Sequence, residues 1–376
     1  MTSPAPTEAI TPFRIHVSDQ QIADLKERLA MTRWPDEVTD DWSRGQPVSF
    51  IKALCDQWLN GFDWRAAEAR LNRLPHFTTE IDGQTIHFVH VRSARPGALP
   101  LILTHGWPSA FTEYLALIEP LTNPAEGPAF DVVIPSLPGF GFSTPLRSSG
   151  WDSARTAGAW HVLMQRLGYD RYGFVGNDVG SIVGKEIGVQ APSGLVGVHV
   201  QQIFAFPADQ ADWAKMDTFE AEGMANADKW EANNGYQRVQ QTRPATLAYG
   251  LVDSPAAQLA WNTELVFGFD GNRADTFDRE HFLVDASIYW FTGSGGSAAN
   301  AYLEDAKSNG GDDSRRVDVP VAVAVFPDDF RSVRAFCEAN NNIRHWTQMP
   351  RGGHFGAIEE PVLLANDIRE FFGTLV

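Results

Sequence analysis

The stretch YGFVGNDVGSIVGKEIG, residues 172–188, decides the fold. It begins with an apolar run, turns between Gly176 and Gly180, and continues as a helix-like segment. Strand, tight turn and helix in this order are typical of the turn that presents an enzyme's nucleophile, usually in the pattern G-x-S-x-G. Here the central residue is Asp178. The sequence therefore predicts a nucleophile turn that carries a carboxylate in place of a hydroxyl.

Short apolar runs on both sides of this stretch have the character of buried strands. They are rich in Val and Ile, and they are TIHFVHV, LPLILTHG, FDVVIPSL, RYGFVGND, LVGVHVQQ and VPVAVAVF. Continuous apolar runs are typical of strands that are buried on both faces of a parallel sheet. Helical patterns lie between several of the runs, as in AWHVLMQRLGY. This alternation predicts a doubly wound α/β domain.

Two segments depart from the alternation and predict further parts of the chain. The first 75 residues have helical periodicity, and Ser18 with Gln21 forms a capping box at the first helix. The segment 206–300 is polar and helical without strand signals, which is typical of a lid over strand ends. We therefore predict a helical arm at 1–80 that packs on the core, a core at 81–205 and 301–376, and a helical lid at 206–300.

Composition limits the partners and cofactors. The formal charge of −17 argues against nucleic acid and anionic membranes, which clustered Lys and Arg would bind. The only two cysteines, Cys55 and Cys337, are expected in the core, so no disulfide framework, thiolate metal site or cofactor is predicted. No signal peptide and no 18-residue apolar run is found. We expect a soluble, cytoplasmic protein, and a homo-oligomer is compatible with these properties.

Further residues predict a catalytic triad around Asp178. The triad acid is expected after the run VPVAVAVF, where Asp329 is preferred and Asp328 is the alternative. His354 follows in a glycine-flanked loop, RGGHFG, before the last predicted helix. The carboxyl ends of strands form the ligand-binding edge of an open α/β sheet. The chain order nucleophile, acid, histidine is diagnostic of α/β-hydrolases.

The loop in LTHGWPSAF supplies another part of the predicted site. Its strand ends at His105, and the backbone N–H of Trp107 is placed to join that of Val179 in an oxyanion hole. We expect His105 to support the loop rather than to act as a base.

An aspartate nucleophile restricts the reaction. Its carboxylate is ionised at neutral pH and attacks without a base. Attack on an acyl carbon would give an unstable anhydride, so the target is an sp³ carbon with a leaving group, either an epoxide oxygen or a halide. The resulting ester of Asp178 would be hydrolysed by water that His354, held by Asp329, activates. The two backbone N–H groups would stabilise the oxyanion of this step.

These motifs resemble the microsomal-type branch of the epoxide hydrolases over nearly the whole chain. The resemblance rests on FDWRAAEARLNRLPHF and IDGQTIHFVHV in the arm, and on HGWP, PSLPGFGFS, GNDVG and RGGHFGAIEEP in the core. It implies an N-terminal arm, an α/β-hydrolase core and a helical lid, in a soluble bacterial-type member that converts an epoxide and water to a vicinal diol. It is also compatible with a role in secondary metabolism, because some soluble relatives act on epoxides in antibiotic biosynthesis.

The resemblance assigns two lid tyrosines to the opening of the epoxide ring. In that family they protonate the epoxide oxygen, and the matching positions are Tyr236 and Tyr302. A phenol with a pKa of about 10 can donate to a more basic alkoxide and is protonated at neutral pH. The aromatic residues of the lid either favour an apolar or aryl epoxide or form the core of the lid. They include Trp213, Trp230, Trp261 and Phe267.

Two other functions are left open by the residues. A haloalkane dehalogenase shares the aspartate nucleophile, and it commonly has an indole N–H directly after it to bind the halide. This chain has Val179 at that position, although Trp107 is a second possible donor. A non-catalytic ligand-binding protein on the same scaffold is expected to lack a member of the triad, and here each member has a candidate.

Overall fold

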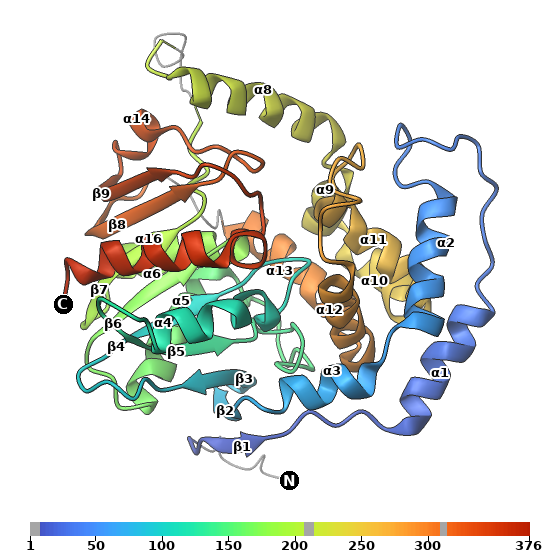
Figure 1. The fold of residues 1–376 in the computed structure, drawn as a ribbon, viewed down its shortest axis with the longest axis horizontal. Coiled ribbons are helices and arrows are strands. Elements are labelled where there is room, and N and C mark those ends of the chain that lie inside the picture. Colours follow the sequence, from blue (N-terminus) through green and yellow to red (C-terminus); the bar gives the residue numbers. More distant parts are fainter. Residues whose placement is uncertain (1–7, 207–213, 309–313) are drawn as a thin grey trace.

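A nine-stranded sheet lies at the centre of the part of the chain that the structure describes (Figure 1). The computed structural model describes residues 8–206, 214–308 and 314–376. The strand order is β1-β2-β3-β5-β4-β6-β7-β8-β9, with antiparallel pairs from β1 to β5 and parallel pairs from β5 to β9. The strands are β1 Thr11–Phe13, β2 His76–Ile81, β3 Gln84–Val91, β4 Leu99–Thr104, β5 Phe130–Pro135, β6 Tyr172–Gly176, β7 Leu195–Val200, β8 Val317–Val325 and β9 Asn341–Gln348.

Helices cover both faces of the sheet. On one face lie α5 (Ser153–Arg166) and α6 (Val179–Gln190); on the other lie η2 (Phe111–Leu117), α4 (Ile118–Thr122) and α16 (Pro361–Gly373). Successive side chains of β4 point to opposite faces of the sheet. Leu101 and Leu103 belong to the apolar cluster that includes α16, and Ile102 belongs to the cluster that includes α5. Burial on both faces explains why the strands are continuous apolar runs. Two further short helices are α14 (Arg334–Cys337) and α15 (Gly356–Glu359).

The six runs predicted as strands are β3 to β8, and the predicted doubly wound sheet is confirmed. Three strands were not predicted: β1 and β9 at the two edges of the sheet, and β2 next to β1. In β9, the sequence NNIRHWTQ is mostly polar and half-buried, so it lacks the apolar run that marks a central strand. The three-residue β1 lies in a segment that was read as helical, and it is too short to show a period.

Between β7 and β8 the chain forms a set of lid helices, coloured from yellow-green (α8) to orange (α13) in Figure 1. They are α8 Thr218–Asn233, α9 Gly235–Thr242, α10 Pro244–Asp253, α11 Pro255–Phe267, α12 Arg279–Thr292 and α13 Gly295–Ser308. Proline at the first positions of α10 and α11 is well tolerated, because the N–H it lacks has no partner there. The predicted lid boundary at residue 300 falls within α13. Trp213 lies outside the described residues.

The N-terminal arm connects the lid to the core. Its helices are α1 Asp19–Ala30, α2 Val48–Asp56, the π-helix η1 Gln57–Gly61 and α3 Trp64–Leu71. The predicted capping box of Ser18 and Gln21 is confirmed at α1. Helices α1 and α2 pack on α11, and the indole of Trp58 donates a 2.9 Å hydrogen bond to Ser287 of α12. Strand β1 and residues of α3 pack with the core instead. The arm therefore holds lid and core together.

Both cysteines, Cys55 and Cys337, are buried, as expected of core residues. Among the helices of the described residues, none has both the length and the apolar composition needed to cross a membrane.

Candidate active site

Asp178 lies in a strained turn between β6 and α6. Its φ of 54° and ψ of −121° are unusual for a residue with a side chain, and such strain costs roughly 1–3 kcal/mol. Gly180, two residues later, permits the turn to pack against β4, because a Cβ at this position would collide with the carbonyl oxygen of Thr104 at the end of that strand. The carboxylate side chain is 16% exposed at the carboxyl edge of the sheet. This is the position predicted for a nucleophile.

Two backbone N–H groups lie at the carboxylate of Asp178. Trp107 N donates to Oδ1 over 2.9 Å, and the N–H of Val179 lies close enough to lower the pKa of the carboxyl. Gly106 allows this approach, since a Cβ there would overlap Asp178. Burial raises the pKa of Asp178, and the opposing effects of His354 and the two N–H groups do not reverse that direction. The two predicted oxyanion donors thus converge on the predicted nucleophile.

His354 lies between two carboxylates. Its Nδ1 is 2.8 Å from Asp329 Oδ1, and its Nε2 is 3.8 Å from Asp178 Oδ2. Nε2 is buried and has no hydrogen-bond partner among the residues described. Asp328, the alternative acid, is exposed, and its backbone N–H donates to Gly352 O over 3.1 Å. The structure therefore brings Asp329, rather than Asp328, to the histidine.

Charge and burial act on this triad in opposite directions. Burial lowers the pKa of His354, but Asp329 and Asp178 together outweigh it and raise the pKa to about 9. Burial raises the pKa of Asp329, but its pairing with His354 and a bond from Gln202 lower it overall. The imidazolium paired with Asp329 is thus strongly favoured while both carboxylates are charged.

Two amide side chains at the triad lie outside the set predicted from the sequence. Asn177, just after β6, donates from Nδ2 to His354 O and to Glu113 Oε1, each over 2.8 Å. Gln202, just after β7, bonds Asp329 and the backbone N–H of Asp178. Burial raises the pKa of Glu113 to about 7, with the Asn177 bond opposing it. Their positions in the sequence could have identified both residues as site candidates. Polar residues just after parallel strands meet at one edge of the sheet.

The two predicted lid tyrosines pack against the Trp107 loop. The ring of Tyr236, at the start of α9, stacks on Trp107 with centroids 5.2 Å apart and planes at 19°. Tyr302, on α13, meets the same indole edge-on at 6.0 Å and 90°. Burial and then the charge of Asp178 raise the pKa of both phenols. The lid thus places both hydroxyl-bearing rings within the electrostatic field of the nucleophile.

The other lid aromatics divide between the site and the lid core. Trp230 lies close enough to Tyr236 to oppose the rise in the pKa of that phenol, and Trp261 packs in the apolar cluster that contains Tyr236 and Trp107. Phe267 instead belongs to the apolar cluster that joins the arm to the lid. His105 acts as predicted, since its ring bonds Gly106 O over 3.0 Å and accepts from Leu137 N over 3.2 Å.

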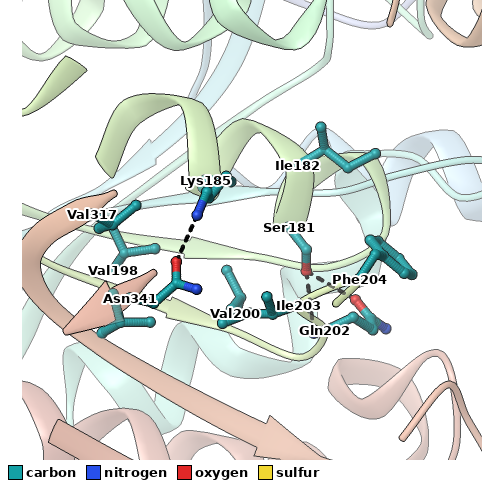
Figure 2. A pocket seen from close by; sticks show the side chains of 12 residues that line it. Ser181, Ile182, Lys185, Val198, Val200, Gln202, Ile203, Phe204, Val317 and Asn341 are labelled. Carbon is teal, nitrogen blue, oxygen red and sulfur yellow. Dashed lines mark hydrogen bonds between the residues drawn. The ribbon is translucent and has the colours of Figure 1, made fainter. Parts of the chain in front are cut away.

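A small cavity lies behind the site, between α6 and strands β7 and β8. Figure 2 shows Ser181 and Gln202 at one end and the bonded pair Lys185 and Asn341 at the other. Its volume is about 30 Å³, well below the roughly 150 Å³ of a cavity that binds benzene. It is therefore too small to hold an organic substrate. Elsewhere, across the described ranges, no group of three His, Cys, Asp or Glu side chains is arranged to hold a metal ion.

The sequence matches two family models. Residues 10–114 match the model described as epoxide hydrolase N terminus, and residues 100–227 match the model of the alpha/beta hydrolase fold. A Stigmatella aurantiaca protein, provisionally named as an epoxide hydrolase, is 42% identical over 97% of this chain and 85% of its own. Epoxide hydrolase 1 of Sus scrofa is 31% identical over 99% of this chain and 90% of its own.

Solved structures agree with the sequence relatives. Juvenile hormone epoxide hydrolase from the silkworm Bombyx mori superimposes with a TM-score of 0.90 at 25% identity, covering 98% of this chain and 95% of that one. Aspergillus niger epoxide hydrolase gives a TM-score of 0.86 at 29% identity, with coverage of 99% and 98%. The predicted fold and family are both confirmed: the chain belongs to the microsomal-type epoxide hydrolase family and has its α/β-hydrolase fold.

Proposed function

We propose that this chain hydrolyses an epoxide to a vicinal diol through an ester of Asp178. One observation carries the proposal: His354 Nε2 is unbonded and lies 3.8 Å from Asp178 Oδ2. This distance is beyond hydrogen-bond range, so the histidine does not activate the nucleophile as it would a serine. It instead lies beside the carboxyl carbon, where a base could activate water against an ester.

In the first step, an oxygen of Asp178 attacks an epoxide carbon. The C–O bond of the ring breaks, its electron pair moves to the ring oxygen, and Tyr236 or Tyr302 donates a proton to that oxygen. The charge of Asp178 raises the pKa of both phenols. Because this charge is consumed as the ester forms, the phenols become better acids when the alkoxide develops.

In the second step, the neutral form of His354 takes a proton from water, which attacks the carbonyl carbon of the ester; this form becomes more populated once the ester has removed the charge of Asp178, which had raised the pKa of His354. The Trp107 N–H, which donates to the carboxylate, and the neighbouring Val179 N–H would stabilise the tetrahedral oxyanion. Collapse of this intermediate releases the diol with the proton from His354. The carboxylic acid left on Asp178 returns its proton to the tyrosinate, which restores the starting charges.

The surroundings of the site favour an apolar or aryl epoxide. Trp107, Tyr236 and Tyr302 meet ring to ring, and Phe269 stacks beside Tyr236 with centroids 6.5 Å apart. Such a set of rings stabilises an apolar ligand by burial of its surface and by edge-to-face contact.

The proposal is tested by mass spectrometry of the intact His354→Gln variant after incubation with styrene oxide. We expect the protein to gain the mass of one epoxide, with the adduct mapping to Asp178, because ester formation continues while hydrolysis is blocked. The matched control is Asp178→Ala combined with His354→Gln, which should gain no mass.

A panel of aliphatic epoxides and haloalkanes accompanies styrene oxide, with diol and halide release measured for the unaltered protein. If an epoxide is turned over but gives no adduct in His354→Gln, the covalent mechanism is wrong. Halide release without diol formation would instead assign the chain to the dehalogenases.

A further inference from the structure

Gln202 occupies the point where the nucleophile turn and the acid loop meet. It is the second residue after the end of β7 and is 1% exposed. Its Oε1 accepts from the backbone N–H of Asp178 over 3.0 Å. The same oxygen accepts from Ser181 Oγ over 2.8 Å (Figure 2). One oxygen of this amide therefore fixes the backbone of the strained residue and the first turn of α6.

The nitrogen of the same amide points to the other side of the triad. Nε2 donates to Asn177 Oδ1 over 2.7 Å and to Asp329 Oδ2. The opposite orientation of the amide would set an oxygen against the Asp329 carboxylate and an N–H against the N–H of Asp178. Only the observed orientation satisfies these partners, and it uses both donors and both acceptor sites of the side chain.

We propose that Gln202 is a positioning residue for ester hydrolysis, because it binds Asp329 Oδ2 so that Oδ1 is presented to His354. This inference rests on the proposed function. The geometry gives Asp329 two anchors, with His354 Nδ1 on Oδ1 at 2.8 Å and Gln202 on Oδ2. A carboxylate held at both oxygens keeps the imidazole in one orientation, with Nε2 directed at Asp178.

Loss of the amide should affect the two chemical steps unequally. Ester formation needs Asp178 and the lid tyrosines, whereas ester hydrolysis also needs His354 in its correct orientation. Without the Gln202 N–H, the buried charge of Asp329 is less well stabilised and holds the proton of His354 more strongly. Hydrolysis should therefore become slower, and a higher pH should be needed to reach its maximum rate.

The test compares Gln202→Met with Gln201→Met. Gln201 is the neighbouring glutamine, is 2% exposed, and neither polar atom of its side chain has a partner within the described residues. Methionine is close in volume to glutamine but has no amide, so both variants make a similar change in packing. Ester formation and ester decay are followed in single turnovers of styrene oxide by intact-protein mass spectrometry.

For Gln202→Met we expect ester decay to slow by roughly 10- to 100-fold, with a smaller loss in ester formation. We also expect the midpoint of decay against pH to move upward by about half a unit or more. Gln201→Met should keep the wild-type rates and midpoint. Equal losses in the two variants, or an unchanged Gln202→Met variant, would overturn the assignment.

A second variant guards against misfolding of the first. Gln202→Glu keeps the side-chain volume and an oxygen toward Asp178 N–H, but it sets an oxygen against Asp329. Ester decay should fall further behind the wild type as pH rises and the introduced carboxyl ionises. A wild-type decay rate across this range would contradict the proposal. If the unaltered protein turns over epoxides without an Asp178 ester, the proposed function itself has failed, independently of Gln202.

Discussion

The nucleophile turn and the acid loop each place a buried aspartate beside His354, yet they hold it differently. Asp178 receives the backbone N–H of Trp107 and lies 3.8 Å from the imidazole. Asp329 bonds the imidazole directly at 2.8 Å and receives the Gln202 amide. Accordingly, the pKa of Asp178 is raised from its ordinary value, mainly by burial, whereas that of Asp329 is lowered by its pairing with His354 despite burial.

The difference shows how one residue type can take two roles at one site. A carboxylate whose charge is fully paired is a poor nucleophile, because its lone pairs are committed to donors. Asp329 is in that state and can only orient and stabilise the imidazolium. Asp178 is less well stabilised as an anion, so it gains more when its charge is consumed in a bond to carbon. Substitutions that change Asp178, Asp329 or the groups around them one at a time can separate the two roles.

The largest effect is expected from removing the nucleophile. Asp178→Ala should reduce diol formation by roughly 10⁴-fold or more, because no other group forms the ester. Chromatographic measurement of the diol and intact-protein mass spectrometry check this, with no adduct expected. Diol formation at a wild-type rate would exclude Asp178 from the reaction.

The next effect separates the two aspartates of the acid loop. Asp329→Asn should slow ester hydrolysis by roughly 10²- to 10⁴-fold, because the amide no longer fixes the tautomer of His354. Ester formation should be affected less, so the adduct should accumulate. Asp328→Asn is the matched control, since Asp328 is exposed and adjacent. A larger loss in Asp328→Asn than in Asp329→Asn would reverse the assignment of the acid.

A smaller loss is expected when the lid is changed rather than the core. Tyr236→Phe and Tyr302→Phe should each slow ester formation by roughly 10-fold, and the double variant by about 10²-fold or more. Ester decay should change little, since the tyrosines act on the ring oxygen. The control is Tyr249→Phe, because Tyr249 is 80% exposed on α10. Unchanged ester formation in the double variant would remove both tyrosines from ring opening.

The two sides of the site also differ in how far the sequence predicted them. Asp178, His354 and the Trp107 loop occur in short motifs, where turn chemistry requires particular residues at fixed spacing. The choice between Asp328 and Asp329 could not be made from spacing, because it depends on which side chain the loop turns inward. The structure distinguishes the two residues, because Asp329 Oδ1 lies 2.8 Å from His354 Nδ1 whereas Asp328 is exposed.

The hydrogen-bonded residues behind the triad were not predicted for a related reason. Gln202 and Asn177 are ordinary polar residues in sequence, and their partners lie 21 to 177 positions away. Contacts of this kind follow from strand register and side-chain direction, which local periodicity does not encode. Strand β9 was not predicted for the same reason. It lacks an apolar run, and what makes it a strand is its pairing with β8.

The smallest effect is a shift in pH dependence that tests the contrast between the two carboxylates directly. His354 has a pKa of about 9 while both Asp178 and Asp329 carry charge. In the ester the charge of Asp178 is gone and that of Asp329 persists, so the pKa of His354 should fall by roughly one unit. Hydrolysis needs the neutral imidazole, so its rate should rise with pH and level off below the free-enzyme pKa. Single-turnover decay of the ester against pH, compared with an NMR titration of His354 in the free protein, measures both midpoints. Coincident midpoints would mean that the charge on Asp178 does not act on His354, and that the two carboxylates differ in distance alone.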